Sequence, residues 1–281
     1  MKHSIHLTVA EALAEDIGHG DITARALVPE DARCTATLVA KENGVLSGMA
    51  AYREAFEQAG AAPQAWSGLC DGDHFAPGDV VATFSGKTRP ILSGERTALN
   101  FVQRLSGIAT LTRRFVEKLD GLDCQVCDTR KTTPLLRFLE KEAVRHGGGA
   151  NHRFNLTDGI LIKENHIAAA GGIAEAIARA RLNVHHLVRV EVEVTNLAEL
   201  KEALEFRADV IMLDNMDLET MARAVHFNNN WEGGWVVLEA SGNVTLDRVR
   251  AIAETGVDFV SCGALTHSAP AVDLSLLISP Q

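Results

Sequence analysis

The segment Val188-Arg189-Val190-Glu191-Val192-Glu193-Val194 alternates valine with charged residues along its whole length. Side chains of a β-strand point alternately to opposite faces, so the valines share one face and the charged residues share the other. The apolar face packs on helices, which leaves the charged face to point into a barrel. Buried charges persist where they are paired or bind a metal. We therefore expect Arg189 to pair with Glu191, and Glu193 to be available for a metal ion or a substrate.

Similar short apolar segments surround this one, and helical patterns separate them. The candidate strands are Gln125–Asp128, Gly159–Ile162, Val188–Glu193, Val210–Leu213, Trp235–Glu239 and Asp258–Ser261, with helical patterns over 135–145, 167–182, 197–206, 218–226 and 246–255. Strands that alternate with helices at this spacing form a parallel sheet with right-handed crossovers. Because no long connection marks a switch point, we expect a closed or nearly closed α/β barrel.

The first part of the chain has a different pattern, which indicates a small α+β domain. A helix is expected over Thr8–Asp16 with Thr8 as its N-cap, and a strand over Cys34–Ala40 turns back at 42–44 into Val45–Ser47. A long helical pattern over 91–119 is interrupted at Gly107. We expect residues 1–110 to form the first domain, residues 111–267 to form the barrel, and residues 268–281 to return to the first domain.

Polar or small residues follow every candidate strand of the barrel. They are, in order, Asp128-Thr129-Arg130-Lys131, Lys163, Glu193, Asp214-Asn215, Ser241-Gly242-Asn243 and Cys262-Gly263-Ala264. The C-terminal ends of barrel strands meet at one mouth, where catalytic groups lie. Any one of these residues could be a cap or a surface group, but six in phase indicate a site for anions and a divalent metal.

Two ligand types suit these residues. Glu193 and Asp214 can share a hard cation such as Mg²⁺, which keeps most of its waters and bridges phosphates. The turns Ser241-Gly242-Asn243 and Gly263-Ala264 precede helices, and backbone N–H groups at such turns bind phosphate, although a plain βα turn would look the same. His152 beside Arg153 is suited to hydrogen-bond a substrate carboxylate.

Charge is unevenly distributed along the chain. Residues 96–163 hold 12 Lys/Arg and 7 Asp/Glu, whereas the whole chain carries a net charge of −10. A local positive region in an acidic chain attracts a small polyanion and gives no footprint for nucleic acid. No apolar run has the length of a signal peptide or a membrane span, so we expect a cytoplasmic protein. Five cysteines argue against a disulfide framework.

The chain resembles the quinolinate phosphoribosyltransferase family over nearly its whole length. The resemblance rests on 14–23 (Ala-Glu-Asp-Ile-Gly-His-Gly-Asp-Ile-Thr), 95–100 (Glu-Arg-Thr-Ala-Leu-Asn), 128–132 (Asp-Thr-Arg-Lys-Thr), 151–153 (Asn-His-Arg), 163–166 (Lys-Glu-Asn-His), 191–194, 213–215 and 263–267. It implies an N-terminal α+β sandwich domain, a barrel of fewer than eight strands, and a homodimer in which Arg96 reaches the neighbouring site. It also implies phosphoribosyl transfer from phosphoribosyl pyrophosphate to quinolinate, with loss of CO₂ and no organic cofactor.

The resemblance also implies a role for each site residue. Quinolinate would be held by Arg130, Arg153, Lys163 and His152, with Arg96 from the partner, and Lys131 would lie between the substrates. Glu193 and Asp214 would bind Mg²⁺ and the ribose. The 5′-phosphate would be held by Ser241, Gly242 and Gly263. Thr129, Asn243, Cys262 and Ala264 complete the expected substrate-binding set, and Lys131, Lys163, Glu193 and Asp214 are the expected catalytic residues.

Three alternatives remain open at the level of sequence. Lys163 could form a Schiff base in a barrel lyase or aldolase, because neighbouring cations depress the pKa of a lysine. The chain could also bind dicarboxylates without turnover. A molybdenum-transport-associated paralogue of the same fold would keep the phosphate-binding half and take a different acid.

Overall fold

The computed structural model describes residues 2–281, with side chains from residue 5 onward. The chain divides into two compact units. The first contains the chain up to Arg113 together with Thr133–Gly148 and Ser268–Gln281, and the second contains Arg114–Thr132 and Gly149–His267. No helix among the described residues combines the length and the apolar character that a bilayer crossing requires.

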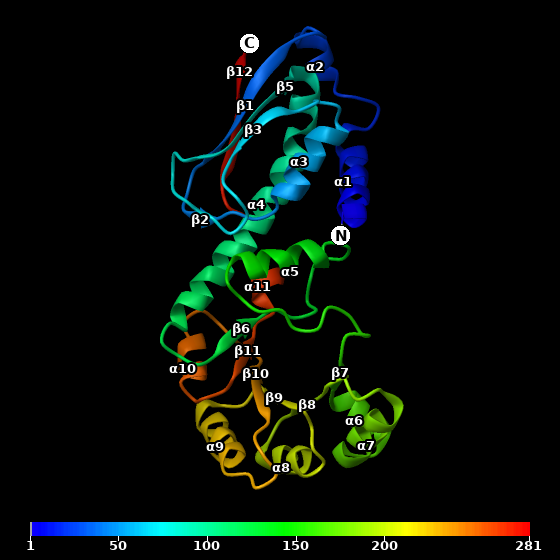
Figure 1. Cartoon of the computed structure of the whole chain (residues 1–281), viewed down its shortest axis with the longest axis vertical. Coiled ribbons are helices and arrows are strands. Elements are labelled where there is room, and N and C mark those ends of the chain that lie inside the picture. Colours follow the sequence, from blue (N-terminus) through cyan, green and yellow to red (C-terminus); the bar gives the residue numbers. More distant parts are fainter. Residues whose placement is uncertain (1) are drawn as a thin grey trace. The chain divides into compact units, whose positions relative to one another are not determined.

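An antiparallel sheet forms the centre of the first unit (Figure 1). Its strand order is β12 (Leu274–Pro280), β1 (Arg33–Ala40), β5 (Val80–Lys87) and β3 (Gln64–Gly68). Alternate residues of β1 are buried, as expected for a strand with one face on a core. Helix α3 (Met49–Gln58) packs on that face, where Phe56 lies 4.8 Å from Phe84 of β5 between ring centroids.

Two local expectations for this unit are wrong. The segment after β1 does not form a hairpin with it: β2 (Gly44–Val45) pairs with β4 (His74–Phe75), because β5 and β12 already occupy both edges of β1. Helix α1 (Lys2–Ile17) begins well before Thr8, so Thr8 is not its cap. The next helix, α2 (Ile22–Leu27), does have a side-chain cap, since Asp21 accepts from the N–H of Ala24 at 2.9 Å.

Helix α4 (Thr88–Lys118) continues through Gly107 without interruption. A Cβ placed on Gly107 would lie 2.0 Å from the carbonyl oxygen of Pro270. Glycine is therefore present for a close approach of two backbone segments, and not as a helix breaker. The unit is completed by α5 (Arg137–His146).

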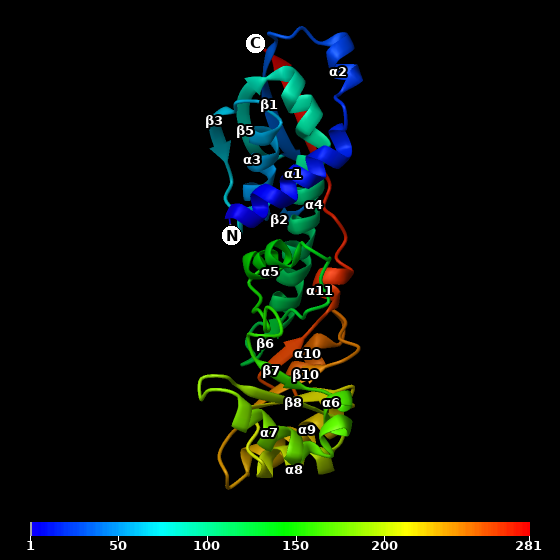
Figure 2. The same ribbon diagram turned by 90° about the vertical axis from the view of Figure 1, so that its right-hand side faces the viewer.

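The second unit is a parallel sheet of six strands with helices between them (Figures 1 and 2). The strand order is β6 (Gln125–Cys127), β11 (Phe259–Ser261), β10 (Val237–Ser241), β9 (Val210–Asp214), β8 (Val190–Val194) and β7 (Ile160–Ile162). The end strands β6 and β7 are not paired with each other; within the described residues a single bridge between Cys127 and Ala150 links β6 to the segment before β7. The expected α/β barrel with fewer than eight strands is confirmed.

The helices of this unit are α6 (Glu164–Ala170), α7 (Ile173–Asn183), α8 (Leu197–Glu205), α9 (Leu218–Asn229), α10 (Val249–Ala253) and α11 (Ala264–His267). Figures 1 and 2 show α7, α8 and α9 along one side of the strands. The helix expected over 167–182 is divided into α6 and α7. Gly171 and Gly172 have φ of 98° and 148°, and neither value is compatible with a continuing α-helix.

Candidate active site

The register of the parallel strands places Lys163 opposite Glu193. Leu161 of β7 pairs with Glu191 of β8, so the residues two positions further on face each other on the inner side of the barrel. The amine of Lys163 and the carboxylate of Glu193 form an ion pair. The Lys163 side chain is 48% exposed and that of Glu193 is 17% exposed, so a ligand can reach the pair.

The C-terminal ends of β9 and β10 carry a carboxylate and a glycine-containing turn. Asp214 of β9 is directly opposite Ser241 of β10. Gly242 has a φ of 94°, and a Cβ there would lie 2.1 Å from the side-chain oxygen of Asn215. That amide group is held in place, because it donates to Asp214 at 2.8 Å and accepts from Asn243 at 3.2 Å. Glycine is required at 242 for backbone conformation and for space.

The turn after β11 lies against the side chains of Lys131 and His267. A Cβ on Gly263 would be 2.9 Å from Cδ of Lys131 and 3.2 Å from the ring of His267. Lys131 and His267 therefore lie directly against the backbone of Gly263. An exposed amine, an imidazole and a glycine turn together form an arrangement that suits a phosphate. His267 was not among the predicted site residues, although its place just after the last strand could have indicated it.

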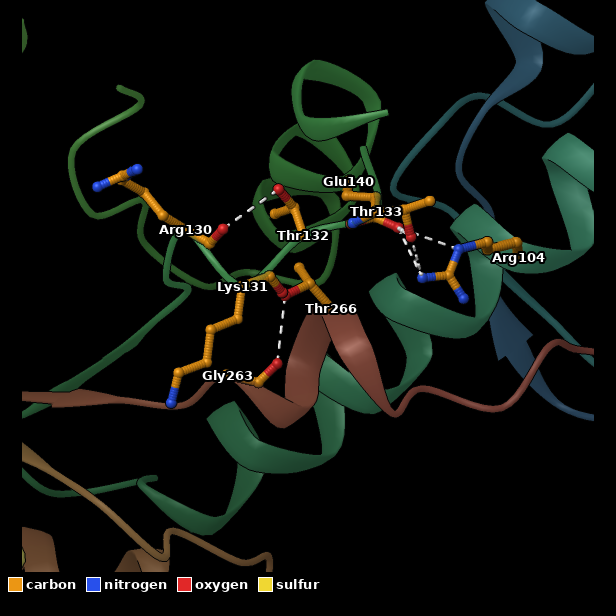
Figure 3. A network of polar contacts seen from close by, with 8 residues as sticks. All are labelled: Arg104, Arg130, Lys131, Thr132, Thr133, Glu140, Gly263 and Thr266. Atoms are coloured by element: carbon orange, nitrogen blue, oxygen red, sulfur yellow. Dashed lines mark hydrogen bonds and ion pairs between the residues drawn. The ribbon is translucent and has the colours of Figure 1, made fainter. Parts of the chain in front are cut away.

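Hydrogen bonds shape the loop that follows β6 (Figure 3). The Lys131 N–H donates to the Thr129 hydroxyl at 3.0 Å. The Thr132 N–H donates to the Arg130 carbonyl at 2.9 Å. The Thr266 hydroxyl donates to the Lys131 carbonyl at 2.7 Å. These contacts fix the main chain from which the Arg130 and Lys131 side chains extend.

Within the first unit, Arg104 of α4 binds a buried carboxylate. Its Nε and Nη2 donate to Glu140 at 3.0 and 2.6 Å, and the Thr133 hydroxyl donates to the same carboxylate oxygen at 2.7 Å (Figure 3). The Thr133 N–H donates to the other oxygen at 3.0 Å. Glu140 is fully buried, and both of its carboxylate oxygens accept hydrogen bonds. The pair with Arg104 is therefore structural.

A second polar cluster lies deeper in the barrel. His152 Nε2 is 3.0 Å from Glu191 and 3.7 Å from Glu239, and all three side chains are at most 12% exposed. Glu191 thus has His152 as its partner, while Arg189 is exposed and precedes β8, so the expected Arg189–Glu191 pair is wrong. Asp128 is fully buried and accepts from the N–H of His152 at 3.0 Å.

His152, Glu191 and Glu239 each place one potential metal-ligand atom in this cluster. The hydrogen bonds of His152 argue against a metal ion at its Nε2. Its Nδ1 accepts from the Arg153 N–H at 2.8 Å, so in a neutral ring Nε2 carries the proton and donates to Glu191. Burial and the nearby Glu191 carboxylate raise the pKa of Glu239 to about 7. We interpret the cluster as two buried carboxylates, Glu191 and Glu239, that share one proton near neutral pH.

The guanidinium of Arg153 is only partly hydrogen-bonded. One terminal nitrogen donates to the Gly159 carbonyl at 2.8 Å, but its Nε is buried without a hydrogen-bond partner among the described residues. Burial and the proximity of Arg130 lower the pKa of Arg153. Two guanidinium groups that repel each other at a partly buried position favour an anionic ligand between them.

Most of the predicted site residues belong to the second unit of the chain. The second unit carries the following predicted site residues at or near the C-terminal ends of its strands: Thr129, Arg130, Lys131, His152, Arg153, Lys163, Glu193, Asp214, Ser241, Gly242, Asn243, Cys262, Gly263 and Ala264. Cys262 is buried, burial raises the pKa of its thiol, and the thiol lies 3.7 Å from the Val244 carbonyl. Arg96 lies exposed on α4 in the first unit, so its predicted contact with a neighbouring site stays a prediction.

Comparison with known proteins gives one consistent family. Residues 21–106 match the N-terminal domain of quinolinate phosphoribosyl transferase, and residues 108–277 match its C-terminal domain. The chain is 47% identical to a probable nicotinate-nucleotide pyrophosphorylase (carboxylating) from Bacillus subtilis, over 93% of this chain and 89% of that one. It is 41% identical to a chloroplastic nicotinate-nucleotide pyrophosphorylase from Arabidopsis thaliana, over 99% and 84% of the two chains.

Solved structures agree with this. The nicotinate-nucleotide pyrophosphorylase from Francisella tularensis superimposes with a TM-score of 0.93 at 42% identity, covering 99% of this chain and 97% of that one. NadC from Streptococcus pyogenes superimposes with a TM-score of 0.94 at 40% identity, covering 100% and 98%. The likeness extends over both units.

Proposed function

We propose that the chain transfers the phosphoribosyl group of phosphoribosyl pyrophosphate to quinolinate. The premise is that the chain belongs to the quinolinate phosphoribosyltransferase family. The reaction releases pyrophosphate and CO₂ and gives nicotinate mononucleotide, a step of NAD biosynthesis. The observation that carries this function is the buried, unpartnered Nε of Arg153 beside Arg130, because a dicarboxylate supplies the acceptors that this nitrogen lacks.

Quinolinate would bind through the cations at the mouth of the barrel. Arg130 and Arg153 would each bind a carboxylate through paired N–H donors, a geometry that lysine does not reproduce. Lys163 would contribute a third positive charge, while its partner Glu193 keeps it directed to the centre of the mouth. Both ring nitrogens of His152 already have partners, so His152 would act by holding Arg153 as well as by any direct contact.

The ribose would be bound between the two carboxylates. Glu193 and Asp214 lie on the inner faces of neighbouring strands, since Glu193 is opposite Met212 and Asp214 is two residues further on. Departure of pyrophosphate leaves positive charge on the ribose, and these carboxylates stabilise it. The ring nitrogen of quinolinate bonds to the ribose carbon that pyrophosphate leaves, which makes a pyridinium. Loss of the adjacent carboxylate as CO₂ leaves an electron pair on the ring carbon, which the pyridinium charge stabilises until that carbon takes up a proton.

The residues present fit Mg²⁺, which prefers carboxylate oxygens and keeps several waters. Glu193 and Asp214 would hold it, directly or through water, and when bound it neutralises the charge of the leaving pyrophosphate. The 5′-phosphate would be held by the turns at Ser241–Asn243 and Gly263, with Lys131 between the phosphate and the acid.

Assembly belongs to the same proposal. Arg96 is exposed on α4, and in a homodimer it would complete the quinolinate site of the neighbouring subunit. Mixing inactive Arg96→Ala protein with inactive Lys163→Ala protein tests this, because a mixed dimer contains one site with both side chains intact. Recovery of activity supports the shared site, and its absence in dimers proven to have exchanged contradicts it.

The function itself is tested by incubating the purified chain with quinolinate, phosphoribosyl pyrophosphate and Mg²⁺. Stoichiometric formation of nicotinate mononucleotide and CO₂ is the expected result, and binding without turnover would refute it. Borohydride trapping on Lys163 with a carbonyl substrate would instead favour a Schiff-base enzyme. The Glu193 carboxylate paired with Lys163 argues against that alternative, since such a nucleophile works as a free amine in an apolar pocket.

A further inference from the structure

A buried hydroxyl connects the loop after β6 to the turn after β11. Thr266, in α11, is fully buried, and its hydroxyl lies 2.7 Å from the Lys131 carbonyl and 3.2 Å from the Gly263 carbonyl. Figure 3 shows the Thr266 hydroxyl between these two backbone groups. A hydroxyl donates one hydrogen, and the shorter distance assigns it to Lys131.

Resting on the proposed function, we propose that Thr266 is a positioning residue for phosphoribosyl pyrophosphate. Its hydroxyl holds the main chain of Lys131 against the Gly263 turn, so that the Lys131 amine stays at the phosphate. Thr266 itself would not contact substrate.

The geometry around Gly263 shows why this bond matters. The aliphatic part of Lys131 crosses Gly263 so closely that a Cβ there would lie 2.9 Å from Lys131 Cδ. Lys131 is exposed, and the loop bonds nearest to it are local, from Thr129 and between Thr132 and Arg130. The local bonds determine the shape of the 129–132 loop. The bond from Thr266, 135 residues later in the sequence, fixes the position of that loop relative to the Gly263 turn.

The substitution Thr266→Val keeps the branched shape and removes the hydroxyl. Loss of one hydrogen bond is worth roughly a factor of 5 to 10 in an equilibrium constant. We therefore expect the KM for phosphoribosyl pyrophosphate to rise by about 5- to 10-fold. The KM for quinolinate should rise by a smaller factor, because Arg130 shares the loop with Lys131 but Arg153 lies outside it and keeps its bond to the Gly159 carbonyl. Thr266→Ser keeps the donor and should restore the wild-type KM.

The matched control is Thr112→Val. Thr112 is also fully buried, and its hydroxyl donates to the Ile108 carbonyl at 2.8 Å within α4. It should lower the melting temperature as Thr266→Val does and leave both KM values unchanged. Amide hydrogen exchange of residues 129–133 gives a readout independent of turnover: exchange should be faster in Thr266→Val and unchanged in Thr112→Val.

Equal KM values in Thr266→Val and Thr112→Val would overturn the inference. So would a Thr266→Ser protein as impaired as Thr266→Val, because the defect would then come from packing and not from the hydroxyl. A wild-type protein without turnover would refute the proposed function instead, and the exchange measurement would still decide whether Thr266 holds the loop.

Discussion

The substitution Glu239→Gln should remove a pH dependence of stability that the barrel interior creates. Glu239 is buried next to Glu191 and His152, and its pKa is raised from an ordinary 4.5 to about 7. Between these values the folded chain binds a proton that the unfolded chain has released. Stability therefore falls as the pH rises through this range. Glutamine resembles the protonated acid and cannot ionise, so the variant should not show this loss.

The size of the effect follows from the two pKa values. A tenfold change in proton affinity is worth about 1.4 kcal/mol, so the full cost of ionising Glu239 in the folded state is about 3 kcal/mol. About 2 kcal/mol of it falls between roughly pH 5.5 and pH 8.5, a range that is convenient for unfolding experiments.

Urea-induced unfolding, followed by tryptophan fluorescence at several pH values, measures the difference between the wild-type chain and Glu239→Gln. The variant should gain about 2 kcal/mol relative to wild type over that interval. Glu254→Gln is the control, because Glu254 is 52% exposed and paired with Arg250 on the surface, and it should follow the wild-type curve. Parallel curves for wild type and Glu239→Gln would mean that Glu239 is ionised at neutral pH, and the shared-proton interpretation of the cluster would be wrong.

Four further substitutions test other parts of the structure. Lys163→Ala and Arg130→Ala should each abolish turnover and leave the circular dichroism spectrum unchanged; near-normal rates would contradict their assignment to quinolinate. Gly242→Ala should weaken phosphoribosyl pyrophosphate binding by at least about 10-fold in calorimetric titrations, because φ is 94° and Asn215 must move; unchanged affinity would exclude this turn from the phosphate site. Glu140→Leu should destabilise the chain by about 3 kcal/mol in urea, because Arg104 and Thr133 lose their buried acceptor; a loss below about 1 kcal/mol would show that water replaces it.

Sequence periodicity predicted the barrel well because each of its strands is short, apolar and followed by a helix. All six candidate strands exist, and their ends differ from the expected ones by one or two residues at most positions. The alternation around Glu193 correctly placed it at the mouth of the barrel. The pairing of Glu193 with Lys163 depends on the register of β7 against β8, which no pattern within either strand determines.

The errors have a common origin in contacts between distant segments. Gly107 was interpreted as a helix break, but it allows the close approach of Pro270, 163 residues later in the chain. Glu191 was paired with its neighbour in sequence, whereas its partner, His152, comes from a separate loop. Tertiary contacts of this kind override local pattern.

The edge position of β12 has a consequence for the order of folding. β1 pairs on one side with β5 and on the other with β12, and Gln103 of α4 donates to the Leu274 carbonyl at 2.8 Å. During synthesis the ribosome makes every barrel strand before it makes β12. The free edge of β1 in the first sheet thus stays unpaired until late in translation. During that period the edge is accessible to chaperones and can pair with a wrong strand.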